Sequence, residues 1–242
     1  MNNKEITDIN TINNIPQYIY MATSKGEEVA TINPEWKKLQ ILKYFNFYLK
    51  ISGIPQNYWS YDLDNIHIES SIIDQAREFI RDVDKTTSLY LYGENSTGKT
   101  TTACVIAKEL IKLNLNCYYI LSSDAIDCLM ASSGYNNSVE DEVSSLRNKL
   151  KDIDILIVDD IFDKNKSLYW NTQANNLIVG QWDYLIRYRC SHKKKNIFTS
   201  NVDINKINTD FGRSVSELIE TNFKFIKFER NDVKNIRQSS LL

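Results

Sequence analysis

The run GENSTGKT at residues 93–100 constrains this chain more than any other feature. It completes the pattern G-x-x-x-x-G-K-[ST], and it lies between a stretch typical of a buried strand and a stretch typical of a helix. Gly93 and Gly98 allow positive φ angles, so that successive backbone N–H groups can converge on phosphate oxygens. Because the chain has only seven glycines in 242 residues, a chance match is rare. The run therefore predicts a nucleotide-binding loop.

The side chains of this loop have expected roles in binding ATP and Mg²⁺. The Lys99 ammonium is expected to reach the β- and γ-phosphates, and the Thr100 hydroxyl is expected to bind Mg²⁺. The helix that follows directs the positive end of its dipole toward the same anion. The residues predicted to bind the cofactor are Gly93, Glu94, Asn95, Ser96, Thr97, Gly98, Lys99, Thr100 and Thr101.

Two later strand ends supply further polar side chains. In ILIVDD (155–160), Asp159 is predicted to be a metal ligand, and Asp160 is predicted to orient or polarise the attacking water. NIFTSN (196–201) becomes polar at its end, where the strands of an open parallel sheet face the ligand crevice. Asn201 is therefore a candidate contact for the γ-phosphate or the attacking water. The alternative is a strand that simply reaches solvent.

Apolar runs and helical periodicity alternate from residue 68 onward, which predicts an α/β domain with a central parallel sheet flanked by helices. Strands are expected at 88–93, 117–122, 153–160, 195–201 and 223–229, the last as an edge strand. Helices are expected at 70–83, 99–114, 138–151, 176–189 and from 215.

The N-terminal region differs in character from this domain. Residues 1–33 are polar and show little regular pattern, whereas residues 35–52 have apolar side chains at helical spacing. This helix either packs on the main domain or docks a partner.

Composition and charge exclude several classes of protein. The net charge of −2 and the pI near 5.8 provide no overall basic field for nucleic acid or membranes. Any DNA contact must therefore be local; the basic run HKKK (192–195) is one candidate, unless it is a solvated loop. The four cysteines lack metal-site spacing, so zinc is not expected. No apolar run is long enough for a membrane span, and a cytoplasmic location is expected.

Taken together, the motifs resemble those of the AAA+ ATPases, with NIFTSN in the place of their first sensor. They are more similar to those of the DnaC/DnaI-type helicase loaders and the related IstB transposition ATPases. The segments that carry this similarity are GIPQNYW (53–59), ILIVDDIF (155–162), IRYR (186–189), NIFTSN (196–201) and GRSVSELIE (212–220). The resemblance covers roughly residues 51–237.

The resemblance implies an AAA+ P-loop core over residues 51–242, preceded by a helical partner-docking segment over residues 1–50. It further implies an ATP-binding loader, of phage or bacterial origin, that associates with the hexameric replicative helicase. Such a loader helps deliver the helicase to single-stranded DNA, which it binds weakly, and self-association is a further implication. The alternatives are an IstB-like ATPase that binds duplex DNA and a transposase, and a small-molecule kinase.

One departure from the family pattern concerns catalysis. Where the family has an arginine that reaches the γ-phosphate of a neighbouring subunit, this chain has Glu217. Arg213, four residues earlier on the same helix face, either replaces that arginine in catalysis or pairs with Glu217. A weak or partner-stimulated ATPase is therefore expected. Other candidates are Arg187 and Arg189 for contacts between subunits, and Lys234 or Arg237 for a second sensor.

Overall fold

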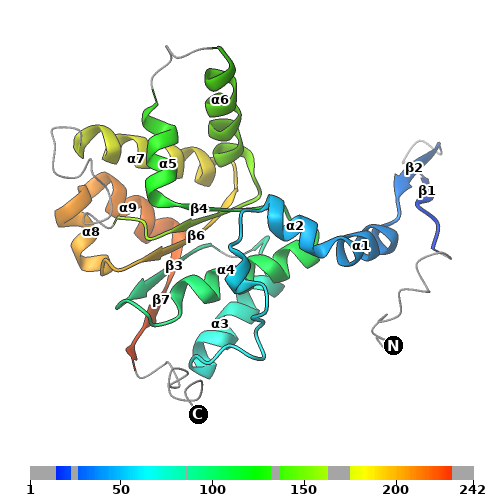
Figure 1. Cartoon of the computed structure of the whole chain (residues 1–242), viewed down its shortest axis with the longest axis horizontal. Helices are drawn as coiled ribbons and strands as arrows, with labels where there is room; N and C mark the ends of the chain where they lie inside the picture. The colour runs from blue at the N-terminus through cyan, green and yellow to red at the C-terminus, as the bar shows by residue number, and fades with distance from the viewer. Residues whose placement is uncertain (1–14, 23–26, 86, 132–136, 163–174, 231–242) are drawn as a thin grey trace.

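The computed structural model describes residues 15–22, 27–85, 87–131, 137–162 and 175–230. At its centre is a five-stranded parallel sheet with the strand order β4-β5-β6-β3-β7 (Figure 1). The strands are β3 (Ser88–Gly93), β4 (Cys117–Leu121), β5 (Ile155–Asp159), β6 (Lys195–Ser200) and β7 (Phe223–Phe228). The predicted α/β class, the parallel sheet and the edge position of 223–229 are confirmed.

The position of β3 brings distant parts of the chain together. It pairs with β6 on one side and β7 on the other, so that Leu89 lies opposite both Ile197 and Lys224. Because all the strands run in the same direction, the residues that follow β3, β5 and β6 meet at one edge of the sheet. The phosphate loop, Asp159 and Asn201 lie at this edge.

Helices cover both faces of the sheet, as expected from β5, in which every residue is buried (Figure 1). Leu89 and Leu91 belong to the core on one face, and Tyr90 belongs to the core on the other. The first face is covered by α3 (Ser70–Arg81) and α4 (Lys99–Lys112). The second is covered by α5 (Ser122–Met130), α6 (Asn137–Asp152), α7 (Asn175–Ser191), α8 (Ile204–Phe211) and α9 (Arg213–Asn222).

The N-terminal region contains strands as well as helices. β1 (Tyr18–Ala22) and β2 (Glu28–Ile32) form an antiparallel hairpin. The helix expected at 35–52 is divided into α1 (Pro34–Lys43) and α2 (Phe45–Ile51), because Tyr44 leaves the helical conformation at φ −108° and ψ 25°. Helices are therefore present at 34–43 and 45–51 and a hairpin precedes them, while the assignment of residues 1–50 as a separate partner-docking segment stays a prediction.

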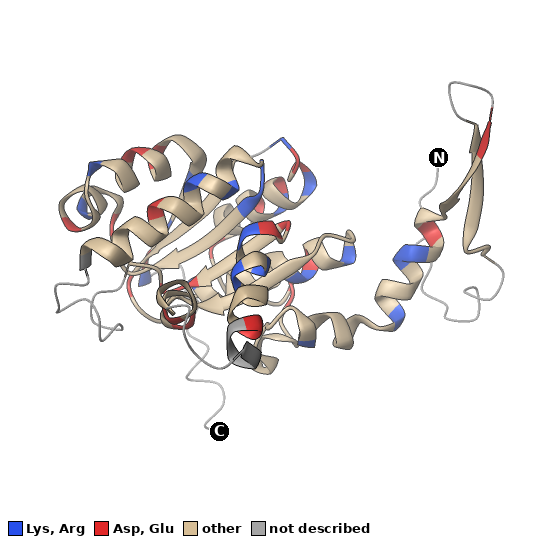
Figure 2. Ribbon diagram, turned by 90° about the horizontal axis from the view of Figure 1, so that it is seen from above, with Lys and Arg blue, Asp and Glu red and all other residues tan. Residues whose placement is uncertain are grey.

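These elements form an arm, which we define as residues 15–22 and 27–51, that extends from the core (Figures 1 and 2). Ile41 and Leu49 attach the arm to the core, where both are buried. Large apolar side chains elsewhere on it are exposed: Tyr18, Tyr20, Met21, Val29, Ile32, Leu42, Tyr44, Phe47 and Ile51. The arm thus presents apolar surface that its own fold does not cover.

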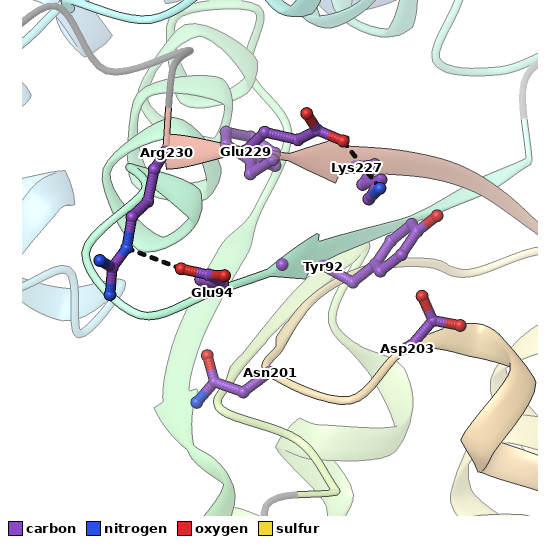
Figure 3. Close-up of a pocket in the computed structure, with 9 residues that line it drawn as sticks. Tyr92, Glu94, Asn201, Asp203, Lys227, Glu229 and Arg230 are labelled. Carbon is purple, nitrogen blue, oxygen red and sulfur yellow. Dashed lines mark ion pairs between the residues drawn. The ribbon is translucent and has the colours of Figure 1, made fainter.

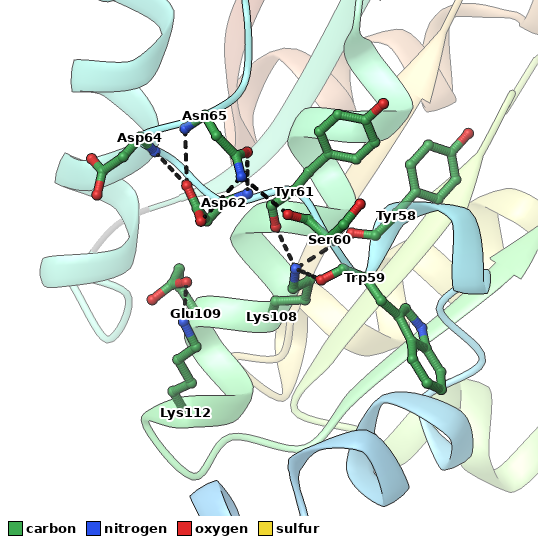
Figure 4. A network of polar contacts seen from close by, with 10 residues as sticks. All are labelled: Tyr58, Trp59, Ser60, Tyr61, Asp62, Asp64, Asn65, Lys108, Glu109 and Lys112. Atoms are coloured by element: carbon green, nitrogen blue, oxygen red, sulfur yellow. Dashed lines mark hydrogen bonds and ion pairs between the residues drawn. The ribbon is translucent and has the colours of Figure 1, made fainter. Parts of the chain in front are cut away.

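The segment between the arm and α3 is held against α4 by one buried lysine. The Lys108 ammonium donates to the carbonyl oxygens of Tyr58, Trp59 and Tyr61, at the end of the short 3-10 helix η2 (Gln56–Tyr58) (Figure 4). Burial and the nearby Lys112 lower the pKa of Lys108. This contact fixes the GIPQNYW segment to the helix that follows the phosphate loop.

Candidate nucleotide-binding site

The two loop glycines have the backbone conformations that their motif requires. Gly93 has a φ of +145°, and a Cβ atom there would lie 2.1 Å from the carbonyl oxygen of Phe228. Gly98 has a φ of +95° and forms the N-cap of α4. Ser96 also has a positive φ, of 62°. The loop therefore surrounds the N-terminus of α4, whose N–H groups and dipole favour an anion.

Lys99 is buried and folded over this loop. Its Nζ donates to the carbonyl oxygens of Gly93, at 2.9 Å, and Glu94, at 2.6 Å. The loop is further braced by Thr97, whose hydroxyl donates to the Glu94 carbonyl at 2.8 Å. The ammonium thus lies beside the N–H groups predicted to bind phosphate.

Asp159 is buried and accepts three side-chain hydrogen bonds. Thr100 Oγ1 and Thr199 Oγ1 donate to its Oδ1 at 2.7 and 2.5 Å, and the Tyr119 hydroxyl donates to its Oδ2 at 2.8 Å. The hydroxyl of Thr100 and the carboxylate therefore lie side by side, as the sequence predicts.

Hard oxygen donors of this kind suit Mg²⁺, which is commonly held by one or two carboxylates together with phosphate groups. Within the described ranges no three His, Cys, Asp or Glu residues gather into a metal site. Thr100 and Asp159 therefore fit a cation whose other ligands include oxygens of a bound phosphate.

Asp160 lies in a different environment from Asp159. It is half-buried and adopts a left-handed conformation with φ 56°, at the turn that follows β5. Its backbone N–H donates to Thr199 Oγ1 at 2.9 Å. Thr199 thereby joins the end of β6 to both carboxylate residues. The catalytic role of Asp160 stays a prediction.

A pocket of about 370 Å³ opens beside the loop, where β3, β6 and β7 end (Figure 3). Its lining residues are Tyr92, Gly93, Glu94, Asn201, Asp203, Lys227, Phe228, Glu229 and Arg230. Glu94 forms an ion pair with Arg230 at 2.6 Å. The structure thus brings Asn201 to the phosphate loop, although its contact with a nucleotide stays a prediction.

The arginines that the sequence suggests for catalysis or for contacts between subunits are engaged with other residues of this chain. Arg213 Nε pairs with Glu217 at 2.5 Å, and both side chains are exposed. Arg187 pairs with Asp183 at 2.9 Å. Arg189 is fully buried, where it donates to Asn196 Oδ1 and to the carbonyls of Leu150, Lys151, Ile153 and Lys195. Arg189 therefore closes the end of α6, and its expected contact with another subunit is wrong. Lys234 and Arg237 lie outside the described residues.

The basic run at 192–195 is partly engaged within the fold. The His192 ring stacks on Tyr188 with 4.1 Å between centroids, and Lys194 pairs with Asp154 at 2.9 Å. Over the described ribbon as a whole, basic and acidic residues are interspersed (Figure 2). A DNA contact at this run stays a prediction.

Tyr119 and Lys108 belong to the surroundings of the site, but the sequence does not predict them. Both lie in stretches that are typical of a buried strand and a buried helix. Their partners come from the distant Asp159 and from the 58–61 segment. No local pattern signals such contacts.

Comparison with known proteins agrees with this geometry. Residues 89–176 match the model of the AAA family, the ATPases associated with various cellular activities. The five-stranded parallel sheet and its phosphate loop give the chain the AAA+ P-loop fold. A search of curated protein sequences finds no match.

Solved structures of replication proteins share this fold. A DnaC helicase loader superimposes with a TM-score of 0.56 at 19% identity, covering 72% of this chain and 100% of that one. DnaI gives 0.57 at 19% identity, with coverages of 73% and 95%. The initiator DnaA, bound to AMPPCP and single-stranded DNA, gives 0.57 at 16% identity, with coverages of 72% and 52%. The resemblance to DnaC/DnaI-type proteins is thus confirmed for the fold.

Proposed function

We propose that this chain is an ATP- and Mg²⁺-binding helicase loader. It associates with a hexameric replicative helicase in the cytoplasm of a bacterial or phage-infected cell, and it helps deliver that helicase to single-stranded DNA during replication initiation. The observation that carries this proposal is the match to the whole of a DnaC loader chain, at 72% coverage of this one. The phosphate loop beside Asp159 and Asn201 supports it.

The N-terminal arm is the proposed docking segment for the helicase. Exposed side chains such as Tyr20 and Phe47, at 71% and 59%, lie on it. Aromatic residues in this setting are typical anchors of protein interfaces. The core carries the nucleotide site, so partner binding and nucleotide binding occupy separate regions of the molecule.

The proposed output is a nucleotide-dependent assembly, with weak or partner-stimulated hydrolysis. Glu217 stands where the family has an arginine, and a carboxylate cannot stabilise developing phosphoryl charge. Arginine fingers contribute about 10³–10⁵ to the rate. Binding alone can drive a switch, since ATP at 100 times its Kd stabilises the bound state by about 2.7 kcal/mol.

Size-exclusion chromatography with light scattering tests the proposal, using the purified chain mixed with the replicative helicase of its host, with and without Mg·ATP. We expect a defined complex whose amount depends on nucleotide. Lys99→Met should remove that dependence, because it deletes the ammonium predicted to contact phosphate. Lys85→Met is the control, because this exposed lysine precedes β3, at the end of that strand opposite the phosphate loop.

Absence of a complex in either condition would contradict the loader function. A complex that is equally abundant with and without nucleotide would contradict the proposed role of ATP. Duplex DNA and transposase binding would then be tested, because they distinguish the IstB-like alternative.

A further inference from the structure

Tyr119 contacts both Ser52, the residue that directly follows the arm, and Asp159, the candidate metal ligand. Its backbone N–H donates to the carbonyl oxygen of Ser52 at 2.7 Å, and its hydroxyl donates to Asp159 Oδ2 at 2.8 Å. Ser52 is the C-cap of α2, the last helix of the arm. One residue therefore spans the distance between the end of the arm and the nucleotide site.

The arm is attached closely at this point. Ser52 is buried, and its hydroxyl donates to the Leu49 carbonyl at 2.7 Å. Gly53 follows with a φ of +72°, and a Cβ atom there would lie 2.7 Å from the carbonyl oxygen of Tyr119. Because β4 is an edge strand, the Tyr119 N–H bonds the Ser52 carbonyl instead of another strand. Ser52 and Gly53 are therefore in direct contact with the backbone of Tyr119.

The other end of Tyr119 fixes the Asp159 carboxylate. With Oδ2 held by the Tyr119 hydroxyl, Oδ1 is the oxygen beside Thr100. The Tyr119 ring is buried in the same cluster as Leu49 and Ile54, so it has little freedom to adjust. The position of the hydroxyl beside Asp159 is therefore tied to the position of the Tyr119 backbone.

From these contacts we propose that Tyr119 is a positioning residue that couples the N-terminal arm to the metal-binding carboxylate of Asp159. The inference rests on the proposed ATP and Mg²⁺ binding, and it adds a route by which the arm and the nucleotide influence each other. Such coupling is reciprocal: a nucleotide that favours one position of Asp159 also favours one position of the arm, and a partner on the arm alters nucleotide affinity.

Tyr119→Phe in the full-length chain tests the coupling, because it removes the hydroxyl and keeps the ring. Tyr118→Phe is the matched control: the neighbouring ring lies under Lys149, 3.6 Å from its Nζ to the centroid, on the opposite face of β4. Circular dichroism checks that both variants are folded. The first readout is binding of a fluorescent ATP analogue over a range of Mg²⁺ concentrations and in EDTA.

We expect Tyr119→Phe to raise the Mg²⁺ concentration at half-saturation about 10-fold, the usual effect of losing a residue that orients a metal ligand. Nucleotide binding in EDTA should stay unchanged, whereas a general structural defect would weaken it. Gly53→Ala should also raise that Mg²⁺ concentration, although residue 53 does not touch Asp159. The double variant should raise the Mg²⁺ concentration little more than either single variant, since both changes act through the contact between Tyr119 and Asp159.

Hydrogen exchange provides the second readout. Mg·ATP should slow amide exchange in residues 45–54 of the wild-type chain and of Tyr118→Phe, but not of Tyr119→Phe. If Tyr119→Phe shows the wild-type Mg²⁺ dependence and the wild-type change in exchange, the coupling is refuted while the proposed function stands. If the wild-type chain itself does not bind the nucleotide, the proposed function fails and the coupling fails with it.

Discussion

Gly93 lies where the phosphate loop leaves β3 and passes the end of β7. Its positive φ leaves no room for a side chain, because a Cβ atom at this position would lie only 2.1 Å from the Phe228 carbonyl oxygen. The glycine is therefore required twice, by the loop that it begins and by the strand beside it. Sequence alone shows only the first requirement.

Gly93→Ala should consequently destabilise the fold. Overpacking of this kind costs about 1–3 kcal/mol, and the strained φ adds to it. Gly180→Ala is the control, because Gly180 is exposed in α7 with no atom within 4 Å of the new Cβ. That change should stabilise the protein by about 0.5–1 kcal/mol. Denaturant unfolding of both variants checks the opposite signs; equal effects would contradict the packing account.

Lys108 and Lys112 lie one turn apart on α4 and have different expected contributions to stability (Figure 4). Lys108→Met leaves the carbonyls of the 58–61 segment without their buried donor, which should cost about 1–3 kcal/mol. Lys112→Met removes a partly exposed ion pair, which should cost less than about 1 kcal/mol. Thermal unfolding of the two variants measures the difference. A loss of stability for Lys108→Met no larger than that for Lys112→Met would show that the 58–61 segment is held by other contacts.

At the residue scale, a motif predicts the role of a side chain only when the residues that define the motif are close together in the sequence. Lys99 and Thr100 follow from the loop pattern, and Asp159 follows from an apolar strand ending in two carboxylates. Tyr119 could not be found this way, because its partners lie 67 positions before it and 40 after it, at Ser52 and Asp159. These contacts depend on the sheet order and on the path of the arm.

At the element scale, α7 and α9 are joined by one carboxylate. Asp183 accepts from Arg187 and from Ser214 at the start of α9, at 2.9 and 2.7 Å. Burial raises the pKa of Asp183, but the hydrogen bonds from Arg187 and Ser214 outweigh it and lower the pKa below its usual value of 3.8. The ionised form therefore stabilises the folded state at neutral pH.

Asp183→Asn should reduce stability at pH 7 by up to about 1 kcal/mol, since the pair is only partly buried. The stability that Asp183 contributes is fully present above pH 3.8 and is lost as the pH falls through its lowered folded-state pKa. The difference between wild type and variant should accordingly close in acid. Unfolding midpoints measured between pH 7 and pH 3 follow this convergence. A difference that stays constant over that range would assign the effect to packing.

The sequence predicts the long elements of the core but not the short ones. The helix at 99–112 is marked by an apolar stripe at helical spacing, β3, β4 and β5 by short apolar runs, and β7 by alternation. α5 and α8, with nine and eight residues, are too short to show a clear helical period, and the hairpin of β1 and β2 lacks a buried face that would give alternation. The N-terminal helix is interrupted at Tyr44, where no glycine or proline marks the break, so the sequence does not reveal it.

At the scale of the whole molecule, the exposed apolar side chains of the arm are expected to contribute little to stability, and they are the proposed contacts with the helicase. Phe47→Ser should leave the unfolding midpoint nearly unchanged, because the side chain is 59% exposed. It should weaken the helicase complex about 10-fold, the effect of removing an interface anchor worth more than 1 kcal/mol. Leu177→Ser is the control, since Leu177 is equally apolar and 61% exposed but belongs to α7.

Titration of each variant against the helicase by light scattering measures this effect. Weakening by Leu177→Ser alone would place the interface on the core instead of the arm. Unchanged affinity for both variants would exclude these two side chains as anchors.

The central position of β3 has a consequence for synthesis of the protein on the ribosome. Leu89 cannot pair with a neighbouring strand until Ile197 and Lys224, which lie more than 100 positions later in the chain, have been synthesised. Pairings between such distant residues form late and slowly, because a long loop must close first. A nascent chain that already contains the whole GENSTGKT run and Asp159 therefore still lacks the sheet edge that aligns them. Alignment of the loop residues with that edge therefore requires that residues 195–228 have already been translated.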